Sequence, residues 1–572
     1  MPRSLAFALA LALALAASAT ASPARFADTV GEFRADERSV SDSFDLPWSD
    51  ASFSRRATLV ATWDKRLAET PWDALSQEER IDWLLLGNYL KGEIADLDLA
   101  RKRLAEMAPL LPFHESIQQL TSARLSRTGS DPATSAANLA AIPAPLRSWK
   151  EQTEARRKEA ATSKAPPPIS PSTALRAAAA TDAIRQSLEA WFRFHDGYQP
   201  DFSWWTRQPY AKAREALEQH AKYLREELAA QKGQPDDPLV GDPIGPDALA
   251  AGIARELIPY SASELIAIAE REFAWCEEQL RRAAEAMRCT TKDALETVKR
   301  AHVPPGGQAD LAAAEAARAI AFLRKHDLVT IPTLCEEIWR LEMIPPDAQK
   351  TLPYAVYGQP AMRVAYPTDA MPHEDKLAAM RGNNRHFLRI VTPHELIPGH
   401  HLQRFAADRS RTWRSLFSTP FFVEGWALHW EMLFWDLDYA ESPEDKVGML
   451  FWRMHRCARI IVSLRFHLGS MSPAEMIDFL VQRVGHETAG ATSEVRRYIG
   501  GAYGPLYQAA YMLGGLQLRA LHRELTAGDR MSQRAFHDAV LAENAIPIAL
   551  VRASLTSEPL TKTWQPSWKF AE

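Results

Sequence analysis

Residues 82–99, DWLLLGNYLKGEIADLDL, repeat apolar residues at steps of three and four. Such steps place the apolar side chains on one face of an α-helix and the polar side chains on the other. Residues 263–287 show the same spacing, with charged residues on the opposite face. Alternating patterns typical of strands are scarce, and residues 356–366 (VYGQPAMRVAY) are the best candidate for a short hairpin or an edge strand. The sequence therefore predicts a mainly α fold with few short strands.

The size of the chain allows more than one hydrophobic core. It has 572 residues, 46% of them apolar and 24% charged, which is the composition of a folded globular protein. Segments rich in proline or glycine interrupt the helical pattern at residues 164–172, 234–246, 303–307 and 344–346. We expect an N-terminal helical lobe over residues 22–330. A C-terminal helical lobe over residues 331–572 is expected to carry the metal site.

The first 21 residues have the features of a secretory signal peptide. Arg3 precedes an Ala/Leu run from Leu5 to Ala17, and residues 19–21 (ATA) match a cleavage site of the A-x-A type. No cysteine stands near this site, so a lipoprotein anchor is not expected. The longest later apolar run, residues 499–521, is interrupted by polar residues and glycines and does not suit a membrane span. We expect a secreted, periplasmic protein.

Charge and cysteine content narrow the possible partners and the redox chemistry. The net charge is −5, and no basic stripe is visible, so nucleic acid is not an expected partner. Four cysteines are too few for a disulfide scaffold. Cys276 and Cys289 could be bridged only if the chain bends between them, and the sequence leaves this pairing open.

The run 392–401, TPHELIPGHH, carries the main chemical signal. Zinc hydrolases often use H-E-x-x-H on one helix, with both histidines as ligands and the glutamate as general base. Here His394 and Glu395 begin the motif, but Pro398 stands at the second histidine position and His400 follows two residues later. In an unbroken helix, six residues correspond to about 240° of rotation and roughly 9 Å of rise, which prevents a shared metal.

A break between the two histidines would remove this difficulty. Pro398 cannot continue the helical hydrogen bonds, and its ring clashes with the carbonyl four residues back, that of His394. Gly399 tolerates backbone angles that other residues avoid. We therefore expect a kink or a two-residue bulge that carries His400 to the position of the second ligand.

The apolar run 420–431, PFFVEGWALHWE, supplies a third ligand. Glu424 is a carboxylate among aromatic residues and needs a partner, which a metal provides. We expect one Zn²⁺ per chain, held by the two histidines and Glu424 with a fourth position for water, although other first-row ions accept this ligand set. Glu431 and His401 are expected to orient the ligands without binding the metal themselves. Alternatively, these residues have a structural role and bind no metal. The two adjacent histidines would then interact with the carbonyls of a helix end, and Glu424 would stabilise the start of its helix through the helix dipole.

These motifs resemble a bacterial family known as domain of unknown function 885. Its pattern H-E-x-x-P-G-H-H-x-Q appears at residues 394–403, and its pattern E-G-W-A-L-x-x-E appears at residues 424–431. Tyr507 and His429 depart from the family, which usually has glutamine and tyrosine there. The resemblance is strong from about residue 330 to 550. Its later segment is matched in part by Glu494, Arg497, Tyr498, Pro505, Tyr511 and Gly514.

The family is similar to helical zinc peptidases such as thimet oligopeptidase and angiotensin-converting enzyme. This likeness implies a large two-lobed helical shell around a deep active-site cleft. It leaves the substrate open, because one fold carries many functions.

Our interpretation is a secreted zinc metallopeptidase that hydrolyses short peptides. Glu395 is expected to act as the general base on a metal-activated water. Tyr511, or in second place Tyr498, is expected to donate a hydrogen bond to the tetrahedral oxyanion. The alternative for either tyrosine is ordinary core packing with a satisfied hydroxyl.

Three further residues are candidates for substrate binding. Arg497 could clamp the terminal carboxylate of a peptide by bidentate pairing, or it could form a surface pair with the nearby Glu494. His429 and His467 are alternative donors to the substrate.

Two other functions remain open at this point. The same residues would serve a metal-dependent amidase or hydrolase that acts on a non-peptide substrate. A non-catalytic exported protein that binds peptide or metal is the third possibility. Glu395 argues against it, because metal binding alone has no use for a base beside the ligands.

Overall fold

The protein is mainly α-helical, as predicted. Its three short strands form one small sheet in the described part of the chain. The expected signal peptide, residues 1–21, lies outside the described residues. No helix in the described ranges has the length and apolar character to cross a bilayer. The computed structural model describes residues 25–571 apart from Arg127, Pro235, Asp236, Thr351, Pro353 and Ala502.

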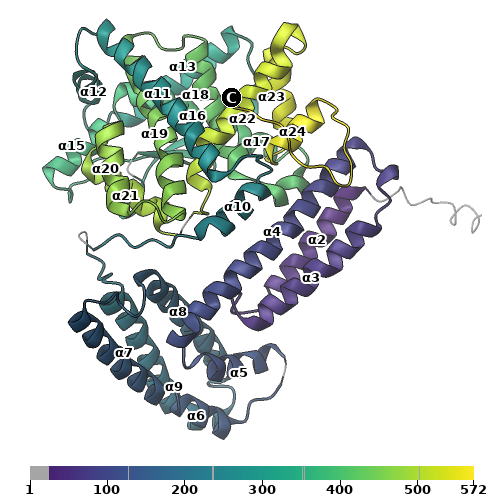
Figure 1. Ribbon diagram of the computed structural model, residues 1–572, viewed down its shortest axis with the longest axis vertical. Helices are drawn as coiled ribbons and strands as arrows, with labels where there is room; N and C mark the ends of the chain where they lie inside the picture. Colours follow the sequence, from purple (N-terminus) through teal and green to yellow (C-terminus); the bar gives the residue numbers. More distant parts are fainter. Residues whose placement is uncertain are drawn as a thin grey trace, which may run out of the picture.

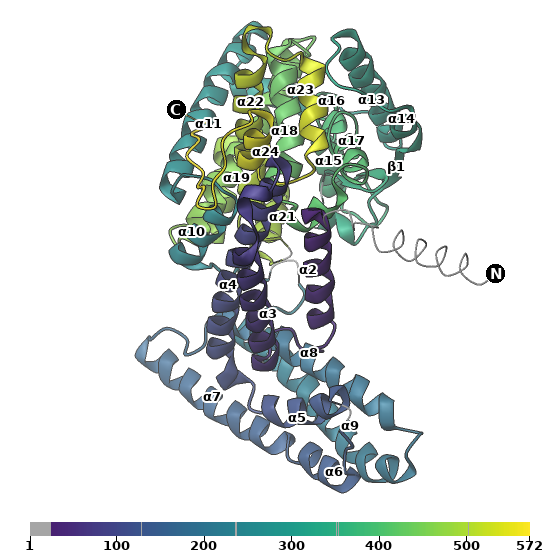
Figure 2. The ribbon, with the colours of Figure 1, turned by 90° about the vertical axis from the view of Figure 1, so that its right-hand side faces the viewer.

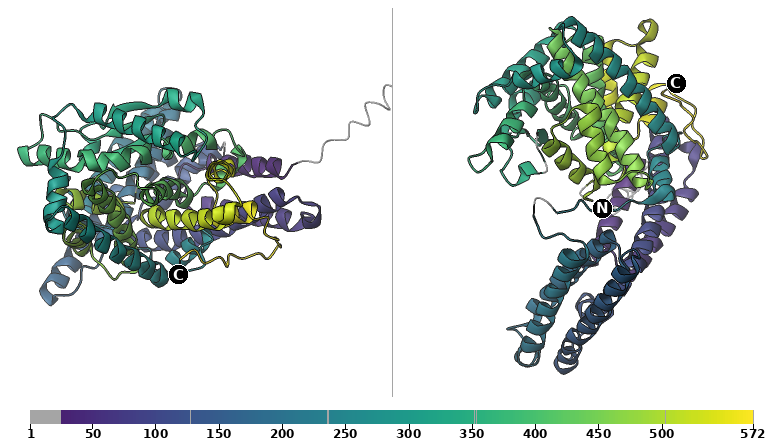
Figure 3. Two further views of the ribbon diagram at one scale, coloured as in Figure 1. Left: turned by 90° about the horizontal axis from the view of Figure 1, so that it is seen from above. Right: turned by 60° about the vertical axis from the view of Figure 1, so that its left-hand side comes forward.

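The N-terminal helices form a column and an arm below a larger helical body (Figure 1). Figures 2 and 3 show the same arrangement from other sides, with the arm projecting away from the body. The column consists of α2 (Phe26–Ser41), α3 (Asp50–Glu69) and α4 (Gln77–Met107). The arm consists of α5 (His114–Leu125), α6 (Pro132–Ala140), α7 (Pro143–Ser163), α8 (Pro171–His195) and α9 (Pro200–Tyr223).

The remaining helices form the body, which holds the residues of the predicted metal site. They are α10 (Gly245–Arg255), α11 (Ala262–Ala286), α12 (Thr291–Arg300), α13 (Gln308–Lys325), α14 (Thr333–Ile338), α15 (His373–Gly382), α16 (Arg385–Glu395), α17 (His400–Ala407), α18 (Pro420–Asp436), α19 (Pro443–His467), α20 (Pro473–Phe479), α21 (Thr488–Ile499), α22 (Tyr507–Thr526), α23 (Gln533–Ala542) and α24 (Ile548–Leu555). Short 3-10 or π turns are η1 (Trp72–Ala74), η2 (Ala108–Leu110), η3 (Leu224–Leu228), η4 (Ala348–Lys350), η5 (Thr412–Phe417), η6 (Leu480–Val484) and η7 (Ala527–Asp529).

The sheet lies within the body and has the strand order β1-β3-β2. β1 (Arg340–Met343) pairs in parallel with β3 (Ala361–Val364), and β2 (Ala355–Gly358) pairs antiparallel with β3. The hairpin expected at residues 356–366 is thus formed by β2 and β3. β2 lies at the edge of the sheet, with a neighbouring strand on one side.

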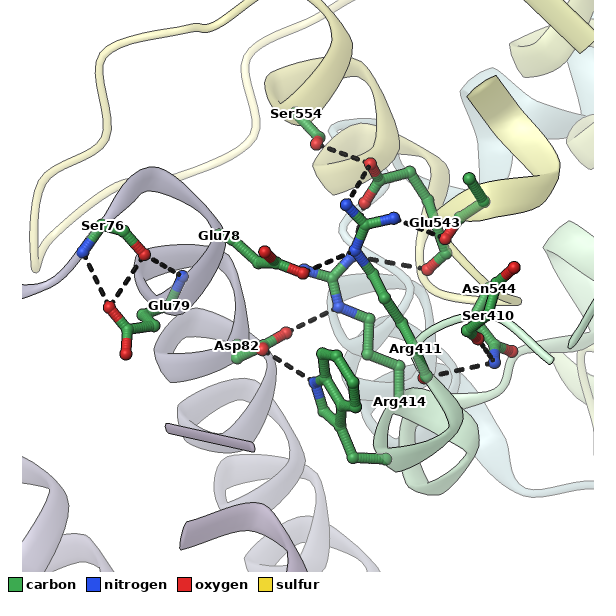
Figure 4. Close-up of polar contacts among 12 residues, drawn as sticks. Ser76, Glu78, Glu79, Asp82, Ser410, Arg411, Arg414, Glu543, Asn544 and Ser554 are labelled. Carbon is green, nitrogen blue, oxygen red and sulfur yellow. Dashed lines mark hydrogen bonds and ion pairs between the residues drawn. The ribbon is translucent and has the colours of Figure 1, made fainter. Parts of the chain in front are cut away.

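Capping boxes define the starts of several helices. At the start of α4, the Ser76 hydroxyl accepts a hydrogen bond from the Glu79 backbone, and the Glu79 side chain accepts one from the Ser76 backbone at 2.9 Å (Figure 4). Ser472 and Glu475 form the same arrangement at α20. Each such cap stabilises its helix by about 0.5–2 kcal/mol.

Two clusters of buried apolar residues hold the chain together. One joins the arm to α3 and the second half of α4 and includes Trp191, Phe202 and Leu217. The larger one joins α2, α3 and the first half of α4 to the body. Within the body, α18 and α22 approach closely because Gly425 and Gly514 face each other. A Cβ on Gly425 would lie 2.5 Å from the carbonyl carbon of Gly514, so any side chain there would force the helices apart.

A buried ion network fastens the column to the body (Figure 4). Arg414 in η5 is fully buried, and its Nε donates to Oδ1 of Asp82 in α4 at 2.6 Å. Its Nη1 donates to Glu543, which follows α23. Trp413 Nε1 donates to the other oxygen of Asp82 at 2.8 Å. Burial raises the pKa of Asp82 despite the neighbouring guanidinium, so the pairing with Arg414 stabilises an otherwise costly buried charge.

All four cysteines are free thiols, so Cys276 and Cys289 are not bridged. α11 continues past Cys276 to Ala286, and the chain turns only at Met287 and Arg288, directly before Cys289. Ten residues of helix separate the ends of that stretch by about 15 Å, well beyond the Cα distance of a disulfide.

Candidate metal centre

The helix that carries His394 ends before the second histidine. α16 stops at Glu395, and α17 begins at His400. Leu396 and Gly399 leave helical backbone angles, with ψ values of −110° and −131°. The expected kink is therefore a complete break between two helices, and His400 occupies the first turn of the second one.

Gly399 is required at this break for steric reasons. Its φ of −75° is open to any residue. A Cβ at this position, however, would lie 1.8 Å from the carbonyl oxygen of His394 and 2.4 Å from its carbonyl carbon. The absence of a side chain lets the two helices meet closely enough to bring their histidines together.

His394, His400 and Glu424 converge at one point in the body. Nε2 of His400 lies 3.2 Å from Oε2 of Glu424, and Nε2 of His394 lies 3.9 Å from the same oxygen. One possible ligand atom from each residue lies within 4.8 Å of the other two. All three side chains are buried. Within the described ranges, this is the one group of three His, Cys, Asp or Glu residues with such spacing.

The donor set fits a divalent metal ion such as zinc. Two imidazole nitrogens and a carboxylate oxygen are zinc ligands, with bonds of about 2.0–2.2 Å that place ligand atoms roughly 3.3 Å apart around a tetrahedral ion. Oε2 of Glu424 is buried and has no hydrogen-bond partner. Burial opposes ionisation of Glu424, but His400, His394 and the Tyr507 hydroxyl outweigh it and hold the pKa of Glu424 below its ordinary value. The carboxylate is therefore charged, as a ligand must be.

Neighbouring side chains orient two of the three ligands. Nδ1 of His394 donates to Oε1 of Glu431 at 2.7 Å, which leaves Nε2 to face Glu424. The Tyr507 hydroxyl donates to Oε1 of Glu424 and leaves Oε2 to face the histidines. Carboxylate contacts of this kind behind a ligating histidine fix its ring and raise its basicity. Glu431 thus has the supporting position expected from the sequence.

His401 points away from the three ligands. Its Nε2 donates to the carbonyl of Cys335 at 2.8 Å, and its Nδ1 accepts from the Tyr357 hydroxyl at 3.1 Å. The Tyr357 ring faces the His400 ring at an interplanar angle of 28°, with centroids 6.4 Å apart. Tyr357, a residue of the edge strand β2, thus lies between His401 and His400 in this chain of contacts.

The three ligands line a cavity of about 490 Å³. Glu395, Tyr511 and Arg497 line the same cavity, as do Val356 and Tyr357 of β2. A second cavity, of about 1100 Å³, is lined by residues of α4, α8 and α10. The two cavities share four lining residues, Ser418, Val423, Glu424 and Tyr507.

The structure brings one of the two candidate tyrosines to the ligands. The Tyr511 ring stacks on His394 at an interplanar angle of 11°, with centroids 6.3 Å apart. Burial, followed by the charge of Glu424, raises the pKa of Tyr511, so its hydroxyl stays protonated and can donate. Tyr498 donates instead to Oε2 of Glu494 at 2.7 Å and does not line the cavity.

The two candidate histidines lie elsewhere. Nε2 of His429 is 2.9 Å from Nε2 of His537, in a buried aromatic cluster. His467 ends α19, where burial and then the charge of Arg103 lower its pKa to about 4. Neither histidine lines the cavity that holds the three ligands.

Arg456, Arg459 and Tyr507 line the cavity although the sequence patterns did not single them out as site residues. α19 offers a signal that could have found the two arginines. Its residues 447–467 are largely apolar, yet arginines recur at positions 453, 456 and 459. Charged side chains are almost never fully buried without a partner, so basic residues at three-residue steps in an apolar helix indicate a buried polar site.

This fold and this cluster define a mainly helical protein with a buried His-His-Glu site. The chain belongs to the family described as bacterial proteins of unknown function (DUF885), whose model matches residues 27–555. The family expected from the sequence motifs is therefore confirmed.

Several solved structures are similar to this chain, and two of them are described as putative lipoproteins. One, "a putative lipoprotein of unknown function" from Shewanella oneidensis, is 17% identical, with a TM-score of 0.65 over 93% of this chain and 100% of that chain. The other, a "putative lipoprotein" from Colwellia psychrerythraea, is 18% identical, with a TM-score of 0.50 over 74% of this chain and 75% of that chain. At these identities the likeness shows a shared fold alone. Comparison with curated proteins finds no significant match.

Proposed function

We propose that this protein is an exported, zinc-dependent hydrolase that cleaves short peptides. The observation that carries the proposal is the convergence of His394, His400 and Glu424 in one cavity, beside the carboxylate of Glu395. When bound, zinc supplies a water acidified to a pKa near 7 and a Lewis acid that polarises a carbonyl group. The remaining chemistry belongs to the side chains around it.

Glu395 has the position that a general base needs. It follows His394 directly, lines the cavity and is close enough to His400 for its charge to raise the pKa of that imidazole. Its carboxylate can accept the proton of an attacking water and pass it to the leaving amine. Such proton transfer commonly contributes about 10²–10⁴-fold to the rate.

Tyr511 is the donor for the negative charge that develops on the substrate. Its ring is fixed by stacking on His394, and its hydroxyl stays protonated because burial raises its pKa. A phenol donates a hydrogen bond without adding a charge of its own.

Two features favour a peptide over a small non-peptide amide. The edge strand β2 lines the cavity, and an extended peptide can add to such an edge by main-chain hydrogen bonds. The larger adjoining cavity gives room for more of the chain. Export is supported by the expected signal peptide and by the description of both similar structures as "putative" lipoproteins.

The test is hydrolysis of a mixed library of short peptides by zinc-loaded protein, with and without a chelator. We expect new amino groups only without chelator. Glu395→Gln should keep its zinc and lose at least about 10²-fold in turnover. The matched control is Glu285→Gln on the exposed face of α11, which should behave as wild type. Normal turnover by Glu395→Gln would remove this residue from the mechanism. Bound zinc without turnover of any peptide or amide would indicate a binding protein.

A further inference from the structure

Four arginines line the cavity, and three of them have largely buried side chains: Arg456, Arg459 and Arg497. Arg456 has a carboxylate of its own, because its Nη2 lies 3.3 Å from Oε1 of Glu431. Arg459 and Arg497 share a single carboxylate, that of Glu494. Nη2 of Arg459 donates to Oε2 of Glu494 at 2.8 Å, whereas Nη1 of Arg497 lies 3.8 Å from Oε1.

The arginine pair therefore carries an excess positive charge in a buried place. Arg459 is only 2% exposed, yet its Nη1 has no hydrogen-bond partner. Nε of Arg497 is buried and unpartnered in the same way. Leaving a buried charged donor unpaired is costly, because its lost hydration is not replaced. The Arg459 guanidinium lies 4.4 Å from the centroid of the Tyr511 ring, and the Arg497 guanidinium lies 4.8 Å from that of Tyr503. These aromatic rings do not replace a counter-ion.

Other charges near the cavity do not offset this excess. Asp408, another acidic residue of the cavity lining, is already paired with the exposed Arg404 at 2.9 Å. Glu424 faces the two histidines, and Glu395 lies beside His400. The arginine pair therefore has unsatisfied donors and charge to spare for a second anion, which a ligand can supply.

Tyr511 fixes the arginine pair at a short distance from the metal ligands. Its ring stacks on His394, and its hydroxyl accepts a hydrogen bond from Nη2 of Arg497 at 3.3 Å. A few residues of extended chain, at about 3.3–3.6 Å each, span from the three ligands to Arg497.

We propose that Arg459 and Arg497 bind the terminal carboxylate of a peptide, so that the protein removes short fragments from the C-terminal end of its substrates. A guanidinium matches a carboxylate in a bidentate manner, which gives orientation as well as attraction. The proposal rests on the hydrolytic function proposed above and names its substrate class. Glu494 is a positioning residue that holds the two arginines in place.

Hydrolysis of matched peptides tests the proposal. Each N-acetylated tri- to pentapeptide is made both as the free acid and as the C-terminal amide. We expect the acids to be cleaved with a kcat/KM at least about tenfold higher than the amides, and mass spectrometry should show cuts one to three residues from the C-terminus. Arg497→Gln should raise KM for the acids to the level of the amides and so remove the acid preference. Arg497→Lys should restore part of the preference.

The matched control is Arg404→Gln, which removes a cavity arginine that already has a partner and should leave the acid preference intact. Circular dichroism of each variant checks that it folds. Equal kcat/KM for acids and amides, or an acid preference that survives in Arg497→Gln, would overturn the proposal while leaving the hydrolase itself in place.

A binding measurement separates the two proposals. Glu395→Gln protein, loaded with zinc, is titrated with each acid and its amide by calorimetry. We expect the acids to bind at least about tenfold more tightly, even if the wild-type protein hydrolyses neither form. Equal affinity of acid and amide would overturn the carboxylate site independently of any turnover.

Discussion

Replacing Gly399 by alanine would place a methyl carbon 1.8 Å from the carbonyl oxygen of His394 and 2.6 Å from that of Pro393. Both neighbours are backbone atoms, so no side-chain rotation relieves the contact. The break between α16 and α17 must open instead, which moves His400 away from His394. Severe overpacking of this kind costs about 1–3 kcal/mol or more. Removing a residue that only hydrogen-bonds to a metal ligand weakens metal binding by roughly 10–100-fold. Displacing the ligand His400 itself should therefore weaken zinc binding by at least that factor.

Denaturant unfolding of the metal-free protein measures the first effect, and zinc competition against a chromophoric chelator measures the second. Gly31→Ala is the matched control, because a Cβ there meets nothing within 4 Å inside α2. It should stabilise the protein by up to about 1 kcal/mol, since alanine is the better helix former. Unchanged stability and zinc affinity in Gly399→Ala would show that the tight break does not position the ligands.

Three other changes test separate parts of the structure. Arg414→Met removes the buried guanidinium that pairs with Asp82 and Glu543 (Figure 4) and should lower the free energy of unfolding by about 3–5 kcal/mol. An unchanged denaturant midpoint would contradict the network. Burial lowers the pKa of His220 to about 4, so its contribution to the free energy of unfolding should be complete above pH 6.5 and fall by roughly 3 kcal/mol as the pH drops towards 4. His220→Gln should flatten this part of the stability profile. A variant profile identical to that of the wild type would refute the assignment to His220. Tyr507→Phe removes the hydrogen-bond donor to Glu424 and should weaken zinc binding roughly 10–100-fold without unfolding the protein. A zinc affinity equal to that of the wild type would show that the Tyr507 hydroxyl does not orient Glu424.

Local patterns in the sequence were sufficient to predict a mainly helical fold and the three residues that converge in the body, His394, His400 and Glu424. The capping residues Ser472 and Glu475 begin α20, and this helix-start signal lies within four residues of sequence. His394 and His400 were predicted as a pair because proline and glycine stand between them. The reason for the glycine, a contact with the carbonyl of the preceding helix, became visible only in three dimensions.

Helical geometry explains why one substrate-binding candidate lies elsewhere. His429 follows Glu424 by five residues, which is about 140° around the helix, so it faces the buried cluster with His537. Glu431 follows by seven residues, within about 20° of the same face, and reaches His394 as expected.

The arginine pair could not be assembled from sequence spacing. Arg459 lies in α19, whereas Glu494 and Arg497 lie in α21. Their meeting depends on how these helices pack in the body, and no short-range pattern encodes that packing. The sequence could offer Arg497 as a clamp, but the excess of two guanidinium groups over one carboxylate depends on the tertiary structure.

The metal stoichiometry of the purified protein tests the central claim most directly. Elemental analysis of protein purified without added metal, followed by zinc titration of the metal-free form, should give one ion per chain. His400→Ala should lose this tight binding, because it removes one of the three converging ligands. Failure of the wild-type protein to bind zinc, or equal binding by His400→Ala, would contradict the account.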